Sequence, residues 1–312
     1  MSFTKTVKGE LVTIPATTDE MLAEFSAFLN MNAEIVLSSK RKTIDFKTTS
    51  PTVAKRFLLL TRTLYQSKTE LITQKQETLK KRQTIIIRIF TNVDKIINEH
   101  DFLGNIIESA KLLTKSTEAK KAFLRGAFLS SGSVNHPKTA EYHLEIFTKN
   151  SDLIIFIQSL IVHFDLNAKI TKRRNGFICY IKDAEGISDF IQAVGAQNAV
   201  FKFEDIRIKR DFNNSINRLM NCEIANEKKI LVSANKQVRD IKFLLKILPE
   251  SKIDNKMQEM MDLRLKYPEA SLIELTNYFE LEYNEEISKS GINHRLKKIK
   301  ELAEFIRNEQ TN

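Results

Sequence analysis

The order of predicted secondary-structure elements recurs along the first two thirds of the chain, and this recurrence limits the folds it can adopt. A helix at Thr18–Met31 is followed by two strands, a helix that begins at Ser50-Pro51, a hairpin and a closing helix near residues 92–99. The order recurs from Glu118 to Val194, about 100 residues further along the chain, with one predicted strand, Tyr142–Thr148, between its first two helices. We therefore predict a tandem duplication of an αββαββα unit with pseudo-two-fold symmetry. Such pairs pack a mixed sheet under helices, so we expect an α+β saddle domain over residues 1–197, with repeats at about 18–100 and 117–195.

Both predicted hairpins carry a basic tip or flank. In the first repeat it is the Lys-Lys-Arg run at residues 80–82, and in the second it is Lys172-Arg-Arg174, beside a predicted type I′ turn at Asn175-Gly176. A charge cluster at a hairpin turn is usually a solvated loop. Its recurrence in both repeats favours a surface that binds nucleic acid.

Residues 198–248 read as a polar helical linker. The segment is rich in asparagine, which is unfavourable in helix interiors and suits caps, contacts between elements or contacts with a phosphate backbone. Three of its cations, Lys209, Arg210 and Arg218, are candidates for secondary DNA contacts.

The C-terminal residues 249–312 carry the signals of a helix-turn-helix module. A helix that begins near Asp254 must end near Tyr267, because Pro268 follows. Ser271 and Glu274 form a capping box at the start of a second helix, which we expect to reach about Phe279. A third, basic helix follows a turn. This order predicts a helix-turn-helix at about Ser271–Glu304.

The third helix has an apolar stripe and an opposite polar face. Its stripe comprises Ile292, Leu296, Ile299, Ala303 and Ile306. Short hydrogen-bonding groups and cations on the exposed side are what a recognition helix needs. The candidate base contacts are Ser290, Asn293, His294 and Lys297, and the candidate phosphate contacts are Lys289, Arg295, Lys298 and Lys300, with Ser288 or Ser290 capping the first turn. Of these, Arg295 lies closest to the predicted buried flank.

Charge supports a polyanionic partner but does not place it. The chain of 312 residues has a formal net charge of +10 and a pI of about 9.4. From Glu250 onward, however, ten Lys and Arg face thirteen Asp and Glu, so the basic excess lies upstream. A second nucleic-acid surface in the first 249 residues is therefore expected.

Several other classes are poorly supported. No apolar run reaches the roughly 18 residues of a membrane span, the first ten residues are polar, and Cys179 and Cys222 form no CxxC pair. The five histidines have no metal-ligand spacing, and there is no phosphate-binding glycine motif. We therefore expect a cytoplasmic protein without a metal, a cofactor or a membrane partner.

Three stretches resemble the WhiA family of bacterial DNA-binding regulators: residues 122–134 (AFLRGAFLSSGSV), 217–226 (NRLMNCEIAN) and 287–299 (ISKSGINHRLKKI). The resemblance extends over essentially the whole chain. It implies a LAGLIDADG homing-endonuclease-like domain followed by a C-terminal helix-turn-helix. It also implies a role in cell division and chromosome segregation, in sporulation where the lineage sporulates, and association with the nucleoid.

The resemblance raises the question of nuclease activity. LAGLIDADG enzymes hold divalent metals with one acidic residue at the foot of each paired helix. In this sequence those positions fall on Asn32 and Ser131, which are poor Mg²⁺ ligands. We predict a non-enzymatic protein whose partner is double-stranded DNA, with the duplicated domain also available to transcription or division proteins. The alternatives are a divergent nuclease that uses other carboxylates, such as Glu34 or Asp19, and an RNA-binding or partner-docking scaffold.

Overall fold

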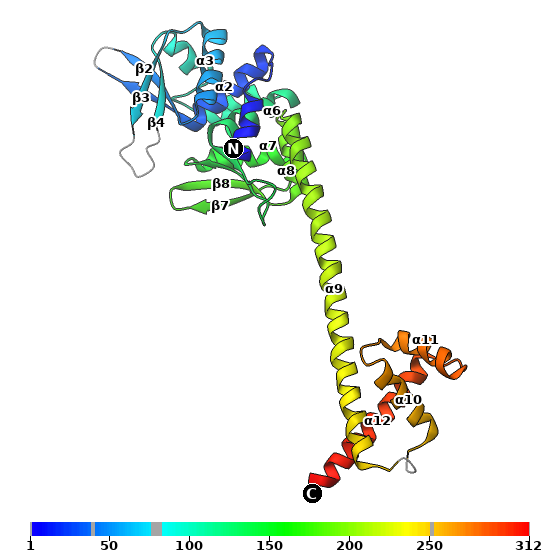
Figure 1. Cartoon of the computed structure of the whole chain (residues 1–312). Coiled ribbons are helices and arrows are strands. Elements are labelled where there is room, and N and C mark those ends of the chain that lie inside the picture. Colours follow the sequence, from blue (N-terminus) through cyan, green and yellow to red (C-terminus); the bar gives the residue numbers. More distant parts are fainter. Residues whose placement is uncertain (1, 39–40, 76–82, 250–252, 312) are drawn as a thin grey trace. The chain divides into compact units, whose positions relative to one another are not determined.

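The computed structural model describes residues 2–38, 41–75, 83–249 and 253–311, and it divides into two compact units (Figure 1). The first unit comprises Met1–Asp211 and the second Phe212–Asn312. The predicted basic run at residues 80–82 lies outside the described residues. Each unit has its own hydrophobic core.

The first unit contains the predicted duplication. Its first repeat consists of α2 (Thr18–Asn32), β1 (Ala33–Leu37), β2 (Lys42–Thr48), α3 (Pro51–Tyr65), β3 (Thr69–Lys75), β4 (Gln83–Ile89) and α4 (Val93–Glu99). The second repeat consists of α6 (Thr117–Ser131), β5 (Gly132–Val134), β6 (Leu144–Thr148), α7 (Ser151–Val162), β7 (Lys169–Arg173), β8 (Gly176–Ile181) and α8 (Ala184–Ala193). Two further helices, α1 (Phe3–Leu11) and α5 (Ile106–Leu113), lie outside the repeats. The predicted αββαββα order is confirmed in both halves.

The prediction of a mixed sheet is wrong. Each repeat forms its own four-stranded sheet, with orders β1-β2-β4-β3 and β5-β6-β8-β7, and every pairing in them is antiparallel. In each repeat, one helix (α3 or α7) connects the second strand to the third. The fourth strand (β4 or β8) then pairs between them, so the two parallel strands are not neighbours.

The second hairpin turns one residue earlier than the sequence indicated. Arg173 pairs with Gly176, so Arg174 and Asn175 form the turn, and neither has a positive φ. Gly176 begins β8 with φ +154, and an added Cβ would lie 2.5 Å from the Thr148 carbonyl oxygen. The glycine is therefore required for close approach of two backbones rather than for a type I′ turn.

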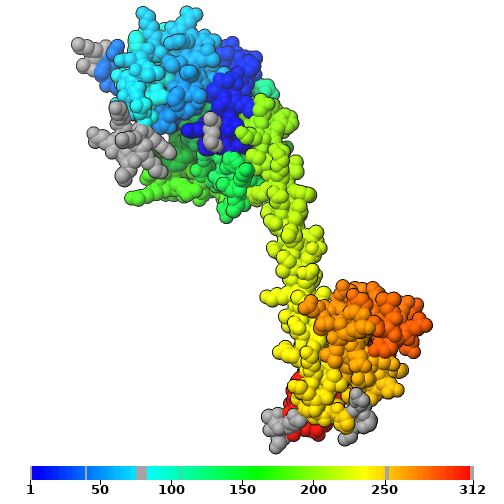
Figure 2. Space-filling model, in the orientation of Figure 1, coloured from blue at the N-terminus to red at the C-terminus, as the bar shows by residue number. Residues whose placement is uncertain are grey.

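The paired helices α2 and α6 form the centre of the first unit. Ala23, Ala27, Ala122 and Ala127 are buried, and a Cβ at Gly126 would lie 2.6 Å from the Glu24 carbonyl oxygen. Small side chains thus let the helix backbones approach each other. In the space-filling view, the first repeat (blue to cyan) and the second (green) form one packed body (Figure 2).

A buried ionic cluster joins the same helices to α3. The Glu24 carboxylate accepts hydrogen bonds from Arg56 at 2.9 and 2.7 Å and from Arg125 at 3.1 Å. All three side chains are at most 5% exposed. Two guanidinium groups that are almost inaccessible to solvent therefore share one carboxylate.

The predicted linker is one continuous helix, α9 (Gln197–Ile247), which begins in the first unit and ends in the second. One of its asparagines joins two elements as predicted, since Asn198 donates to the Glu10 carboxylate of α1 at 2.8 and 3.2 Å. Asn213, Asn217, Asn221 and Asn226 are all exposed within the helix. An exposed asparagine costs a helix only up to about 0.7 kcal/mol relative to alanine, so the favourable residues around it outweigh it.

The described residues of the second unit form three helices after α9: α10 (Asn255–Lys266), α11 (Leu272–Tyr283) and α12 (Lys289–Thr311). The predicted capping box is present, since Ser271 Oγ accepts the Glu274 N–H and the Glu274 carboxylate accepts the Ser271 N–H. The helix it opens extends one turn beyond the expected end, to Tyr283. Met260, Met261, Leu275 and Phe279 join the α12 stripe in one core.

Candidate nucleic-acid interface

The last helix, α12, has the two faces that its sequence predicted. Ile292, Leu296, Ile299 and Ala303 are at most 2% exposed, and Ile306 is 9% exposed. At its start, Ser288 Oγ accepts the Gly291 N–H at 3.1 Å, and the Ser290 hydroxyl lies 3.2 Å from Ser288 Oγ. The buried stripe therefore fixes the rotation of the helix, and the serine fixes its start.

The opposite face is open to solvent. The exposed residues are Ser288, Lys289, Ser290, Asn293, His294, Lys297, Lys298 and Lys300, which include every predicted contact except Arg295. Two of the cations have acidic neighbours one turn on: Lys297 lies 3.6 Å from Glu301 and Lys300 lies 3.7 Å from Glu304. No ion pair of Lys289 or Lys298 is seen among the described residues, so their charges are the ones fully available to an anion.

Arg295 has a different role from the phosphate contact that the sequence predicted. Its side chain is only 19% exposed; it donates to Glu259 at 3.1 Å and lies 5.0 Å from the Phe279 ring centroid. It therefore joins α12 to α10 and α11 inside the module. Its position on the buried flank of the helix is the reason.

A second buried arginine holds the turn before α11. Arg264 is 1% exposed and donates to the Ala270 carbonyl oxygen at 2.6 Å. Burial lowers the pKa of its guanidinium to about 10. This residue was not predicted from the sequence, although its spacing from Met257, Met260 and Met261 places it on the buried face of α10.

The two positions that the resemblance assigned to metal binding, Asn32 and Ser131, lie where α2 and α6 end. Asn32 donates its side-chain N–H to the Ser130 carbonyl oxygen at 3.3 Å, and Ser131 Oγ donates to the Phe147 carbonyl oxygen at 2.5 Å. Both side chains therefore bond protein backbone at the foot of the helix pair. Across the residues that the structure describes, no group of three or more His, Cys, Asp or Glu converges.

Three family models match these parts of the chain: the WhiA N-terminal LAGLIDADG-like domain at residues 18–103, the WhiA LAGLIDADG-like domain at residues 120–213, and the WhiA C-terminal HTH domain at residues 216–303. The chain belongs to the WhiA family. The probable cell division protein WhiA of Enterococcus faecalis is 39% identical over 310 residues, covering 98% of this chain and 99% of that one. The relative of the same name from Oceanobacillus iheyensis is 41% identical over 312 residues, covering 98% of each.

The fold agrees with this membership. The crystal structure of full-length DUF199/WhiA from Thermatoga maritima is similar over 97% of this chain and 98% of that one, with a TM-score of 0.60 and 26% identity. The predicted family and the predicted fold class are therefore confirmed. The HTH model begins at residue 216, inside α9, which agrees with the second compact unit beginning at Phe212.

The carboxylates considered for a divergent nuclease do not meet in this WhiA fold. Glu34 on β1 forms an ion pair with Lys47 on β2. Asp19 lies in the first turn of α2, at the end opposite Asn32. The two acids are therefore separated by the length of the helix.

Described charges on the first sheet pair with one another on the side opposite Ile44 and Phe46. Asp45 accepts two hydrogen bonds from Arg88, at 2.8 and 2.7 Å, in addition to the pair between Lys47 and Glu34. Two cations of this face are thus paired within the sheet. A DNA backbone approaching here has to displace these carboxylates.

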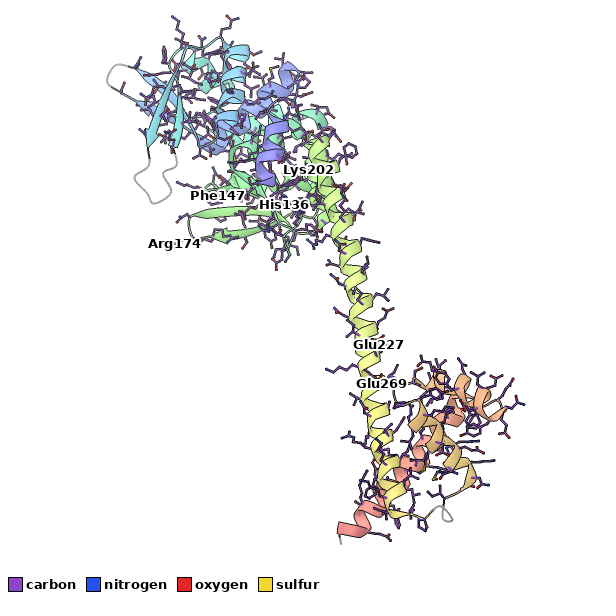
Figure 3. The ribbon with its side chains drawn as sticks, viewed as in Figure 1. His136, Phe147, Arg174, Lys202, Glu227 and Glu269 are labelled. Carbon is purple, nitrogen blue, oxygen red and sulfur yellow. The ribbon has the colours of Figure 1, made fainter. Side chains whose placement is uncertain are left out.

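The second sheet keeps exposed cations at its hairpin. Lys172, Arg173 and Arg174 are exposed, and Arg174 extends from the turn (Figure 3). Arg173 lies 3.8 Å from Glu145, and its side chain remains 59% exposed. The basic tip predicted for the second repeat is therefore present.

The three cations proposed on α9 differ in their surroundings. Arg210 donates to the carbonyl oxygens of Pro137 and Thr139 and lies 4.5 Å from the Tyr142 ring centroid. Its predicted DNA contact is therefore replaced by a contact within the first unit. Lys209 is exposed and pairs with Asp205 at 2.9 Å, and Arg218 is exposed.

None of the described helices combines the length and the apolar character that a membrane span requires.

Proposed function

We propose that this chain is a non-enzymatic, sequence-specific DNA-binding protein, acting as a transcription regulator or nucleoid-associated factor. The observation that carries the proposal is the exposed face of α12. It presents Ser290, Asn293 and His294 on the first two turns, where a recognition helix meets base edges, with Lys297 and Lys298 following. Because the apolar stripe of α12 is buried in the core of the second unit, the opposite face must point to solvent.

The contacts divide into two classes. Asn293 can offer an amide to adenine in the major groove, and Ser290, His294 and Lys297 lie beside it, so these four residues are the proposed base readers. Lys289, Lys298 and Lys300 are the proposed phosphate contacts, with Ser288 as the cap that orients the first turn. Arg295 is excluded from both classes, because Glu259 and Phe279 occupy its guanidinium.

Three features support a non-enzymatic role. Asn32 and Ser131 replace the carboxylates at the foot of the paired helices, and both already bond backbone oxygens. Glu34 is paired with Lys47. Family members carry the name of a cell division protein. We extend that role to this chain, together with chromosome segregation and, where the lineage sporulates, sporulation.

The duplicated domain is proposed as a partner surface for transcription or division proteins. Two described cations of its first sheet, Arg88 and Lys47, are paired with acids, which favours a protein partner over a DNA duplex on that sheet. Arg218 and Lys209 on α9, and the hairpin of the second sheet, remain as secondary DNA contacts.

The test is site selection from a genomic DNA library, with Asn293→Ala compared with Asn308→Ala, an exposed asparagine near the end of the same helix. The proposal expects Asn293→Ala to lose selectivity by about 1–3 kcal/mol at one base position, and Asn308→Ala to keep it. Equal selectivity in all three proteins contradicts the assignment. Supercoiled plasmid incubated with Mg²⁺ or Mn²⁺ tests the nuclease alternative, since cleavage refutes the non-enzymatic role.

A further inference from the structure

A cleft of about 630 Å³ lies at the feet of the paired helices in the first unit. Its walls come from the ends of α2 and α6, from β1 and the end of β2, and from the turns that lead into α3 and α7. Phe147, on β6 of the second sheet, is one of its lining residues (Figure 3). This volume is within the range of small-molecule sites.

The charge of the cleft is positive and only partly compensated. Three lysines line it, Lys8, Lys47 and Lys149, against one carboxylate, Glu34. Glu34 is paired with Lys47. Among the described residues, neither Lys8 nor Lys149 forms an ion pair.

Lys8 is the unusual member. Its ammonium group donates to the Leu129 carbonyl oxygen, at the end of α6, at 3.0 Å and lies 5.6 Å from the Phe128 ring centroid. Burial lowers the pKa of Lys8 to about 8. A partly buried cation without a counter-ion is unfavourable, and an anion in the cleft relieves that cost.

Both repeats contribute the same turn to the wall of the cleft, with a threonine hydroxyl that accepts a backbone N–H. Thr48 Oγ1 accepts the Ser50 N–H, and Thr148 Oγ1 accepts the Asn150 N–H, each at 3.2 Å. These turns open α3 and α7, whose N-terminal ends carry partial positive charge. In addition, the buried hydroxyl of Ser130, a lining residue, has no hydrogen-bond partner.

We propose that this cleft binds the phosphate group of a small phosphorylated molecule, held between Lys8 and Lys149. The inference is independent of the proposed DNA-binding function. With neutral Asn32 and Ser131 at the helix feet and Glu34 paired with Lys47, the cleft lacks, among its described residues, the carboxylate set that a divalent cation needs. The two lysines without ion pairs in the described part of the chain favour an anion instead. A free molecule is favoured over a DNA phosphate because the neighbouring sheet has already paired Arg88 and Lys47 with acids.

The test is calorimetric titration of the full chain with pyrophosphate at low salt. Lys8→Gln and Lys149→Gln each remove one charge from the cleft, and Lys55→Gln, an exposed lysine of α3 that does not line it, is the matched control. A charge-assisted hydrogen bond to phosphate predicts binding weaker by about tenfold or more in each cleft variant. The control is expected to bind as the unchanged protein does.

Three results overturn the proposal. The first is the absence of saturable pyrophosphate binding to the unchanged chain. The second is an unchanged affinity for pyrophosphate in Lys149→Gln, a substitution at an exposed side chain that is not expected to disturb folding. A circular dichroism melt verifies that both cleft variants are folded. The third is displacement of pyrophosphate by a short DNA duplex, which assigns the phosphate to DNA instead of a small molecule.

Discussion

Replacing Glu24 by glutamine tests how the paired helices are held together. The substitution keeps the shape of the side chain and removes the charge that Arg56 and Arg125 share. Two guanidinium groups then remain buried with a neutral amide between them. Breaking a buried ion pair by removing one partner costs about 3–5 kcal/mol, so we expect the free energy of unfolding of the first unit to fall by at least that amount.

The expected fall in melting temperature follows from the size of the unit. For a domain of about 200 residues, 1 kcal/mol changes Tm by roughly 2–4 °C. Multiplying gives a decrease of about 6–20 °C for Glu24→Gln. Differential scanning calorimetry of the full chain measures it, with urea unfolding as a second reading of the free energy.

Glu118→Gln is the matched control, because it makes the same chemical change on α6. Glu118 pairs with Lys121 at 2.8 Å, but its side chain is 62% exposed. Exposed pairs contribute about 0–1 kcal/mol, so Tm is expected to change by only a few degrees at most. If the two variants lose the same stability, the cluster around Glu24 does not hold the helices as argued.

Three further predictions follow from single residues. Gly126→Ala is expected to destabilise the protein by about 1–3 kcal/mol through crowding against the Glu24 carbonyl. Gly9→Ala, with open space around its Cβ, is expected to stabilise it slightly. Urea unfolding measures both changes, and a change of the same sign in the two variants refutes the close approach of the helices at Gly126. Burial lowers the pKa of His100 from 6.5 to about 4, so the unfolded chain binds more protons and stability should decrease as pH falls from about 6.5 towards 4. The variant His100→Gln should show a weaker dependence of stability on pH. An equal decrease in stability in the variant and in the unchanged chain contradicts this prediction. Lys298→Ala should reduce the slope of log affinity against log salt by about 0.9, and an unchanged slope removes this phosphate contact.

Patterns set by nearby residues allowed much of this fold to be predicted. The αββαββα order follows from local periodicity and caps, and the start of α11 follows from the reciprocal hydrogen bonds of Ser271 and Glu274. The rotation of α12 about its axis follows from its single apolar stripe, which must face the core. These features depend on contacts within one or two helical turns.

Features set by distant contacts were missed. The three residues of β5 are too few for a periodicity, and their strand exists because it pairs with β6. Gly176 was misplaced in its turn because its requirement comes from Thr148, 28 residues earlier.

The candidate sites show the same division. Asn293 and His294 were found because exposure on a helix is periodic. The structural role of Arg295 depends on Glu259, 36 residues away, and the position of Lys8 depends on the end of α6, 121 residues away. The spacing of residues along one sequence does not indicate contacts between residues so far apart.

The central claim is that DNA sites are selected by the C-terminal module. The most direct measurement is selection from a genomic DNA library by the full chain and by a chain that ends at Asp211, the last residue of the first compact unit. Our account predicts that the full chain enriches defined sites and that the shorter chain enriches none. Enrichment of the same sites by the shorter chain contradicts it and assigns recognition to the duplicated domain.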